Sequence, residues 1–437
     1  MLICAAGCQG AIGTIDLQIV TAPGSTVMDD VQHVRLTLTN PAKVVEADRV
    51  DGSFDLQLEV DAKGQNGQVF FEGLDAGGTL IASGRTAPLP IGAVDETGHI
   101  YVAPPVSLQE APVTLPTALS ERGASRLSYG VLYAGGRDAD GAPSDEALIY
   151  NVYDHAIQAG DPLPAARAAP SVMTASYGRV IIFGGQDNAG DPSADGWAFD
   201  TNVAPAGAYT AMSTKPELAR AGARAVPIDT DAFMVLGDPL VYIDAVANSA
   251  AAFDGVAPLD GAAVSVILGG RVYTLIAGAD AGVTGATLRI ANQFRELANA
   301  PAELSRTGHD AALLPDGTIL VVAGATGAGI QASGIRYDVA QDQFTVIPDM
   351  LETPRNDAAV AATDDYVVVA GGTDEAGDVV GTAEVFDATT LDRVAVLPMV
   401  VPRTAATAQR MANGQVIIAG GVDANGAPTD VIELFTP

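Results

Sequence analysis

Six arginines recur at similar places in the sequence from residue 113 onward. Each stands a short and similar distance ahead of a glycine that closes an apolar run, and they are Arg122, Arg167, Arg220, Arg306, Arg355 and Arg403. A guanidinium group is a rigid, planar fork of N–H donors that suits carboxylate and phosphate partners. The six arginines therefore predict one of two arrangements. Either they form a cluster that binds an acidic ligand, or each pairs with a carboxylate of the neighbouring repeat and holds the structure together.

Four aspartates recur just after the same glycines, and each begins a D-x-x-G segment: Asp138, Asp187, Asp374 and Asp423. An Asp side chain at such a place accepts hydrogen bonds from the backbone a few positions further on and so stabilises a turn. The alternative is that these aspartates bind calcium. However, the segment DADGAPSDE (138–146) lacks the regular series of oxygen ligands that a calcium loop needs. We expect turn-forming residues here and no metal site.

The elements that must position these residues are internal repeats. Four apolar runs end in Gly-Gly at 135–136, 184–185, 371–372 and 420–421, and three weaker copies carry Gly237, Gly278 and Gly324. The first glycine of each copy therefore recurs with a period of roughly 40–50 residues, which is typical of β-propeller blades when the repeat is built from strands.

The apolar run, Gly-Gly pair and aromatic residue fourteen positions later resemble the kelch repeat. In the fifth copy Tyr337 and Phe344 are seven positions apart, similar to the kelch Tyr-to-Trp spacing. The resemblance implies a seven-bladed propeller over 107–437. The chain ends soon after the third strand of the last blade, so we expect a strand near 113–116 (VTLP) to complete that blade and close the circle, leaving no open sheet edge.

In a four-stranded meander the loop that enters the first strand and the loop between the second and third strands lie on the same face. The kelch resemblance implies that the six arginines line the ligand-facing mouth of the channel on this face. The fourth repeat has Asp260 where the others have arginine. A ring of guanidinium groups without carboxylate partners would favour a carboxylate-bearing glycan or an acidic peptide as the ligand.

The N-terminal part differs from the repeats. Residues 13–106 alternate apolar and polar side chains in short runs such as HVRLTLT and QVFFEGLD, which indicates half-buried antiparallel strands. The segment 75–78 (DAGG) predicts a hairpin loop. About six such strands in this length predict a β-sandwich of the immunoglobulin or fibronectin kind.

No set of residues in the sequence indicates an enzyme clearly. The four histidines (His33, His99, His155 and His309) have no metal-ligand spacing. Copper-radical oxidases of the kelch type need a cysteine beside a tyrosine, and the repeats contain no cysteine. A kelch-type sugar mutarotase remains as the alternative to a non-catalytic binding protein, and we expect no cofactor.

Charge and cysteine content narrow the partners and the location. The net charge of −31 argues against nucleic acid, whose phosphates need concentrated Lys and Arg. Both cysteines, Cys4 and Cys8, lie within residues 1–12, and the residues before Cys8 resemble the end of a bacterial lipoprotein signal. That resemblance implies lipidation at Cys8. The resulting prediction is a monomeric, lipid-anchored cell-envelope protein that binds a protein or glycan on the arginine-bearing face.

Overall fold

The computed structural model describes residues 12–437, apart from residues 57, 62–64, 92–96, 256, 259–260, 281–282 and 291–292. Cys4, Cys8 and Asp260 therefore lie outside the described residues. The fold is all-β, as predicted, and most of its sheets are four-stranded and antiparallel. The helical segments among the described residues are single 3₁₀ turns: η1 (Ser176–Gly178), η2 (Pro216–Leu218) and η3 (Ala302–Leu304).

Residues 107–437 form a series of antiparallel meanders in which each strand pairs with the next one along the chain. The first three sheets comprise β11 (Gly123–Leu127), β12 (Gly130–Ala134), β13 (Ala147–Asn151) and β14 (Ala156–Ala159); β15 (Ser171–Thr174), β16 (Arg179–Phe183), β17 (Gly196–Asp200) and β18 (Ala208–Ala211); β19 (Ala225–Asp229), β20 (Ala232–Val235), β21 (Leu240–Asp244) and β22 (Ser249–Phe253). The next three comprise β23 (Ala262–Leu268), β24 (Arg271–Asp280), β25 (Val283–Ile290) and β26 (Gln293–Glu296); β27 (Thr307–Leu313), β28 (Ile319–Thr326), β29 (Gly329–Ile330), β30 (Gly334–Asp338) and β31 (Gln343–Ile347); β32 (Ala359–Ala362), β33 (Tyr366–Ala370), β34 (Thr382–Asp387) and β35 (Arg393–Pro398).

The last sheet joins both ends of this region. It has the order β10-β38-β37-β36, with β10 (Ser107–Glu110), β36 (Thr407–Arg410), β37 (Val416–Ala419) and β38 (Glu433–Thr436). Leu108 lies opposite Phe435 in the antiparallel β10–β38 pair. An N-terminal strand thus completes this sheet, but it lies at 107–110, whereas residues 113–116 form no strand. The prediction of this strand from the sequence was therefore wrong in position, because it lay a few residues too late in the chain.

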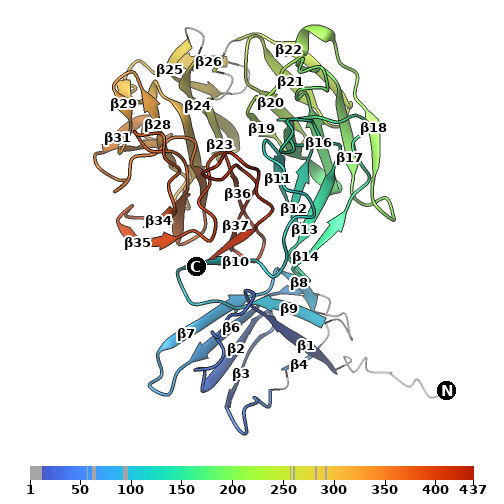
Figure 1. Ribbon diagram of the computed structural model, residues 1–437, viewed down its shortest axis with the longest axis vertical. Coiled ribbons are helices and arrows are strands. Elements are labelled where there is room, and N and C mark those ends of the chain that lie inside the picture. The colour runs from blue at the N-terminus through green and yellow to red at the C-terminus, as the bar shows by residue number, and fades with distance from the viewer. Residues whose placement is uncertain are drawn as a thin grey trace, which may run out of the picture.

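The first strand of each sheet contacts the first strand of the next: β11 contacts β15, and the series continues through β19, β23, β27, β32 and β36. β36 in turn contacts β11, so the series closes on itself. Figure 1 shows these first strands near the centre and the later strands of each sheet further out. The arrangement is compatible with a β-propeller.

The recurring glycines lie where neighbouring sheets meet. Gly135 has a φ of +61°, and a Cβ atom there would lie 2.3 Å from the carbonyl oxygen of Arg167 in the next sheet. The N–H of Gly136 donates to that same carbonyl at 2.8 Å. The pattern repeats between Gly185 and Arg220, also at 2.8 Å. The Gly-Gly pair thus provides both the left-handed backbone and the close approach that join one sheet to the next.

The N-terminal region contains two larger sheets and a short pair. Their orders are β4-β1-β9, β3-β2-β6-β7 and β5-β8, with β1 (Ile12–Val20), β2 (His33–Thr39), β3 (Ala42–Asp48), β4 (Leu58–Asp61), β5 (Gln65–Gly67), β6 (Val69–Leu74), β7 (Leu80–Arg85), β8 (Leu89–Ile91) and β9 (Thr97–Tyr101). Leu36, Phe71 and Ile100 from the two larger sheets share one apolar core. The predicted hairpin loop is present, because Asp75 accepts hydrogen bonds from the N–H groups of Gly77 and Thr79. Strands β3, β5 and β8 were not predicted.

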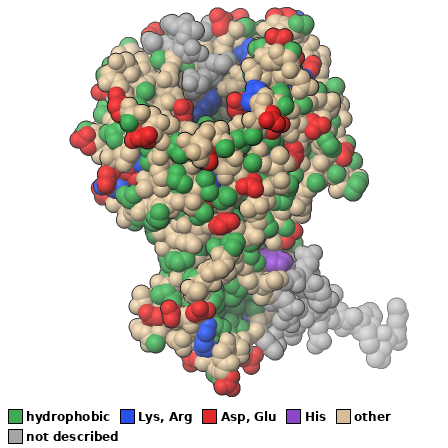
Figure 2. Space-filling model, viewed as in Figure 1, with side chains coloured by type: hydrophobic (Ala, Val, Ile, Leu, Met, Phe, Trp, Pro, Cys, Tyr) green, Lys and Arg blue, Asp and Glu red, His purple; other side chains and the backbone are tan. Residues whose placement is uncertain are grey.

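The two regions pack against each other through a common core. Tyr101 and Ala103 from the N-terminal region lie in the same cluster as Tyr150, Ile417 and Leu434. In Figure 1 the N-terminal sheets lie directly below the closing strand β10. Carboxylates are scattered over the face seen in Figure 2, with few basic side chains among them.

Candidate functional site

The six arginines singled out by the sequence are all buried. Their exposed fractions range from 0% for Arg306 and Arg355 to 6% for Arg122 and Arg220. Burying a guanidinium group is costly unless its N–H groups find acceptors. The acceptors that each arginine uses therefore decide what the set of arginines does.

Two arginines form fully buried ion pairs. Arg403 Nη2 lies 2.8 Å from Glu433 Oε1, and both side chains are 0% exposed. Glu433 also accepts a hydrogen bond at 2.8 Å from the N–H of Val400, in the loop that leads to the arginine. Arg355 and Glu384 repeat this arrangement one sheet earlier at 2.7 Å. Each carboxylate comes from the third strand of the arginine's own sheet, β38 or β34, and so ties the entry loop to that strand.

Two further arginines pair with a carboxylate just before the third strand. Arg167 Nη2 lies 2.6 Å from Asp195, and Arg122 Nη2 contacts Glu146. Arg122 is out of register with the others, because it stands closer in sequence to its glycine, Gly135, than any of the other five arginines does to its own. Its guanidinium group reaches a carboxylate just before the third strand, as that of Arg167 does, but from a different backbone position. The shorter spacing to the glycine was the feature of the sequence that indicated this difference.

Within the described part of the chain, the remaining two arginines find neutral acceptors only. Arg220 Nη1 donates to the carbonyls of Leu236 and Pro239, each at 2.9 Å. Arg306 Nη1 donates to the carbonyls of Ala323 and Ser333. Burial lowers the pKa of Arg306 to about 10, although Glu303 acts in the opposite direction.

These contacts favour the architectural alternative for the arginines. Five of them share one arrangement. The backbone carbonyl of each accepts a hydrogen bond from an N–H of the preceding sheet, and the guanidinium group points into the arginine's own sheet. These five are Arg167, Arg220, Arg306, Arg355 and Arg403. The expected carboxylate of a neighbouring repeat is thus replaced by an acceptor in the same sheet. The prediction that these arginines bind a ligand gains no support from their burial.

The four repeat aspartates form turns, as predicted. Asp138 Oδ1 accepts hydrogen bonds from the N–H groups of Asp140 at 3.0 Å and Ala142 at 2.8 Å. The same pair of bonds occurs at Asp187, Asp374 and Asp423. Local backbone donors thus occupy Oδ1 of each of the four carboxylates.

An axial cavity of about 420 Å³ opens where the chain enters the first strands. Half of its lining residues are alanine or glycine, so the channel remains open at this end. Arg224, ahead of β19, reaches across the mouth to Asp310 of β27 at 2.8 Å. Glu121 and Asp357 are exposed at the same mouth. Opposite charges are thus interspersed here, and Arg122, one of the six arginines that the sequence singled out, is among the lining residues.

Two histidines are buried away from solvent. His309 Nε2 lies 3.0 Å from the carbonyl oxygen of Ala277, between two adjacent sheets, and burial lowers the pKa of His309 to about 3. His155 Nδ1 lies 2.8 Å from the hydroxyl of Tyr150. The His155 ring packs against the ring of Tyr101. Burial likewise lowers the pKa of His155 to about 3. Both histidines therefore act as neutral packing residues at neutral pH.

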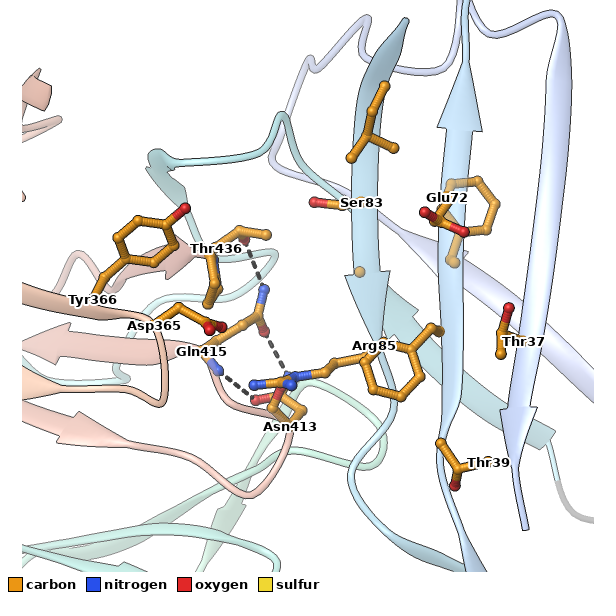
Figure 3. A pocket seen from close by; sticks show the side chains of 15 residues that line it. Thr37, Thr39, Glu72, Ser83, Arg85, Asp365, Tyr366, Asn413, Gln415 and Thr436 are labelled. Carbon is orange, nitrogen blue, oxygen red and sulfur yellow. Dashed lines mark hydrogen bonds between the residues drawn. The ribbon is translucent and has the colours of Figure 1, made fainter. Parts of the chain in front are cut away.

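A second cavity, of about 550 Å³, lies between the N-terminal sheets and the closing sheet. Figure 3 shows its two walls, with Thr37, Glu72, Ser83 and Arg85 on the N-terminal side. Tyr366 and other residues from the last two sheets form the opposite wall. The sequence did not indicate this interdomain cleft, because its two walls come from opposite ends of the chain.

Metal sites, membrane-spanning helices and matches to known proteins were the remaining indications of function. Among the described residues, no group of three or more His, Cys, Asp or Glu side chains is placed to hold a metal ion. No helix in the described part of the chain has the length and apolar character needed to span a membrane. No protein-family model and no curated protein matches this chain.

Proposed function

We propose that this protein is a non-catalytic binding protein of the cell envelope, built as a seven-bladed kelch-like β-propeller with an immunoglobulin- or fibronectin-like sandwich in front. A protein or glycan partner is recognised on the propeller face that holds the axial cavity. The step from a propeller-like fold to binding is an analogy between folds. The observation specific to this chain is the open cavity with charged groups at its mouth.

The axial mouth supports binding because it combines space with charged side chains that remain partly exposed. The Arg224 side chain is 41% exposed and its partner Asp310 is 22% exposed, so both remain within reach of solvent. Exposed ion pairs of this kind contribute little to stability, on the order of 0–1 kcal/mol. A partner can therefore exchange contacts with them at small cost to the fold, in contrast to the buried arginines.

Capture experiments with envelope extract test the location of this surface. We expect the wild-type chain to retain a defined partner, and Arg224→Gln and Ala406→Leu, which alter the mouth and fill the cavity, to reduce its capture at least tenfold. Asp392→Asn, in a loop at the opposite end of the strands, is the matched control. Equal capture by the wild type and both mouth variants, with unchanged melting temperatures, would remove the axial mouth as the binding surface.

Lipid attachment at Cys8 is the second part of the proposal and rests on the sequence resemblance alone. Expressed from its own gene in its native cells, the wild-type protein should partition into the detergent phase. Cys8→Ser should move it to the aqueous phase. The same partitioning of both forms would exclude the lipid anchor.

A further inference from the structure

We propose that the interdomain cleft is a second ligand site, which takes an uncharged, hydroxyl-rich ligand, namely a neutral oligosaccharide. Its volume of about 550 Å³ falls within the range of roughly 300–1,000 Å³ that is usual for ligand sites. Such sites occur preferentially between domains. The identity of the ligand follows from the side chains that the cleft leaves without partners.

The cleft has a fixed shape because both of its walls are anchored. Arg85 Nε donates to the carbonyl of Asn413, near the other end of the chain. Asn413 Nδ2 donates to Gln415 Oε1 at 2.6 Å, and Gln415 Nε2 donates to Thr436 at 2.8 Å. Figure 3 shows this chain of hydrogen bonds crossing the base of the cleft. Together with the core that the two regions share, it preorganises the site and so lowers the entropic cost of binding.

The N-terminal wall presents a sheet face whose side chains are arranged by the strand register. Phe70 of β6 lies opposite Arg85 of β7 and next to Thr37 of β2. The Arg85 guanidinium group stacks over the Phe70 ring, 5.7 Å from its centroid. The backbone groups of β6 are paired on both sides by β2 and β7, and β7 is the last strand of this sheet. Beyond that edge Ser83 pairs with Ala103, and the wall presents its side chains to the cleft.

Several polar groups along the cleft have no hydrogen-bond partner within the described part of the chain. Ser83 Oγ is buried and unpartnered, and Figure 3 shows it pointing toward the opposite wall. The hydroxyls of Thr37 and Tyr366 point from their walls in the same view. A buried hydroxyl without a partner is destabilising, so a ligand group that reaches Ser83 Oγ gains affinity. Thr37 and Tyr366 are half-buried, and their hydroxyls remain within reach of a ligand. Sugar hydroxyls suit them because each can both donate and accept.

Charge balance and apolar surface select a neutral sugar within the class of hydroxyl-rich ligands. The carboxylates of Asp364 and Asp365 act on the positive charge of Arg85, and Glu72 adds a further carboxylate to the lining, so the cleft has no excess of positive charge for an acidic ligand. Phe70 and Tyr366 add apolar ring surface, which suits the C–H faces of a sugar ring. A purely apolar ligand would leave the hydroxyls of Ser83 and Thr37 unpaired.

Calorimetric titration of the full chain tests this inference. The probes are three neutral tetrasaccharides (cellotetraose, maltotetraose and N-acetylated chitotetraose) and one acidic tetrasaccharide, tetragalacturonate. We expect at least one neutral probe to bind at millimolar concentration or below. Thr37→Val and Tyr366→Phe should each weaken binding about three- to tenfold, because each removes one hydroxyl. Phe70→Ala should weaken it further through loss of the ring.

Control variants separate this site from the proposed axial one. Tyr177→Phe removes the hydroxyl of a 90% exposed tyrosine in the turn η1, away from the cleft, and Ala406→Leu alters the axial cavity. Neither should change the affinity for the neutral probe. Loss of binding in Ala406→Leu, equal binding by all cleft variants, binding of the acidic probe alone, or no binding of any probe would each overturn the inference.

Discussion

Two pairs of sheets use the same arginine position with different acceptors. In the sheets of Arg355 and Arg403 the guanidinium group meets a buried carboxylate, Glu384 or Glu433. In the sheets of Arg220 and Arg306 it meets backbone carbonyls and, for Arg306, the Ser333 hydroxyl. The arginine is thus fixed by the path of the backbone, whereas the acceptor on the third strand varies.

These two pairs of sheets also differ in their glycines. The sheets of Arg355 and Arg403 have a Gly-Gly pair after the second strand, whereas those of Arg220 and Arg306 have only Gly237 or Gly324. A Cβ atom at the second glycine would lie against the segment that carries the sheet's own arginine, as at Gly372, 2.5 Å from the carbonyl oxygen of Asn356. The second glycine thus occurs in both sheets that have a fully buried carboxylate. It also occurs in the sheets of Arg122 and Arg167, whose carboxylates are more exposed.

The largest effect should come from removing a cation whose carboxylate stays buried. Arg355→Met leaves Glu384, which is 1% exposed, without its main counter-charge. We expect the free energy of unfolding to fall by about 3–5 kcal/mol, as measured by urea denaturation. The double variant Arg355→Met with Glu384→Leu should recover much of this loss. A single-variant loss below about 1 kcal/mol would show that the pair does not stabilise the sheet.

Acid should lower the stability of the fold through His309, which lies in the sheet of Arg306. Its pKa is about 3 in the folded protein and about 6.5 when unfolded, so the unfolded chain binds the extra proton between these values. Stability is therefore complete above pH 6.5 and is lost as the pH falls, by about 2 kcal/mol at pH 5. Denaturation from pH 7 to pH 5 measures this loss. His309→Gln should remove this part of the pH dependence, leaving that of His155; an unchanged slope would contradict the assignment.

The smallest effect should come from Arg306→Met. This change removes a buried charge that has no carboxylate partner among the described residues, but it also leaves the carbonyls of Ala323 and Ser333 without their donor. Because these two effects oppose each other, we expect a net loss of about 1 kcal/mol. Urea denaturation alongside Arg355→Met gives the comparison directly. Equal losses in the two variants would mean that the type of acceptor makes no difference.

The features that the sequence determined are local. The repeat spacing, the apolar second strands and the D-x-x-G turns each depend on residues that are near neighbours in the chain, so periodicity and turn chemistry predict them. The hairpin at Asp75 and the all-β fold follow in the same way. The need for an N-terminal strand in the last sheet was also predictable, because the repeats ended one strand short.

Only the tertiary structure decided how distant segments pair. The closing strand lies at Ser107–Glu110 because its register is set by β38, at the far end of the chain. The acceptors of the arginines likewise depend on which side chains the third strand of each sheet turns toward them. The interdomain cleft arises where Arg85 meets the turn at Asn413. Side chains at such separations come together only after the chain has folded, and no local pattern records their meeting.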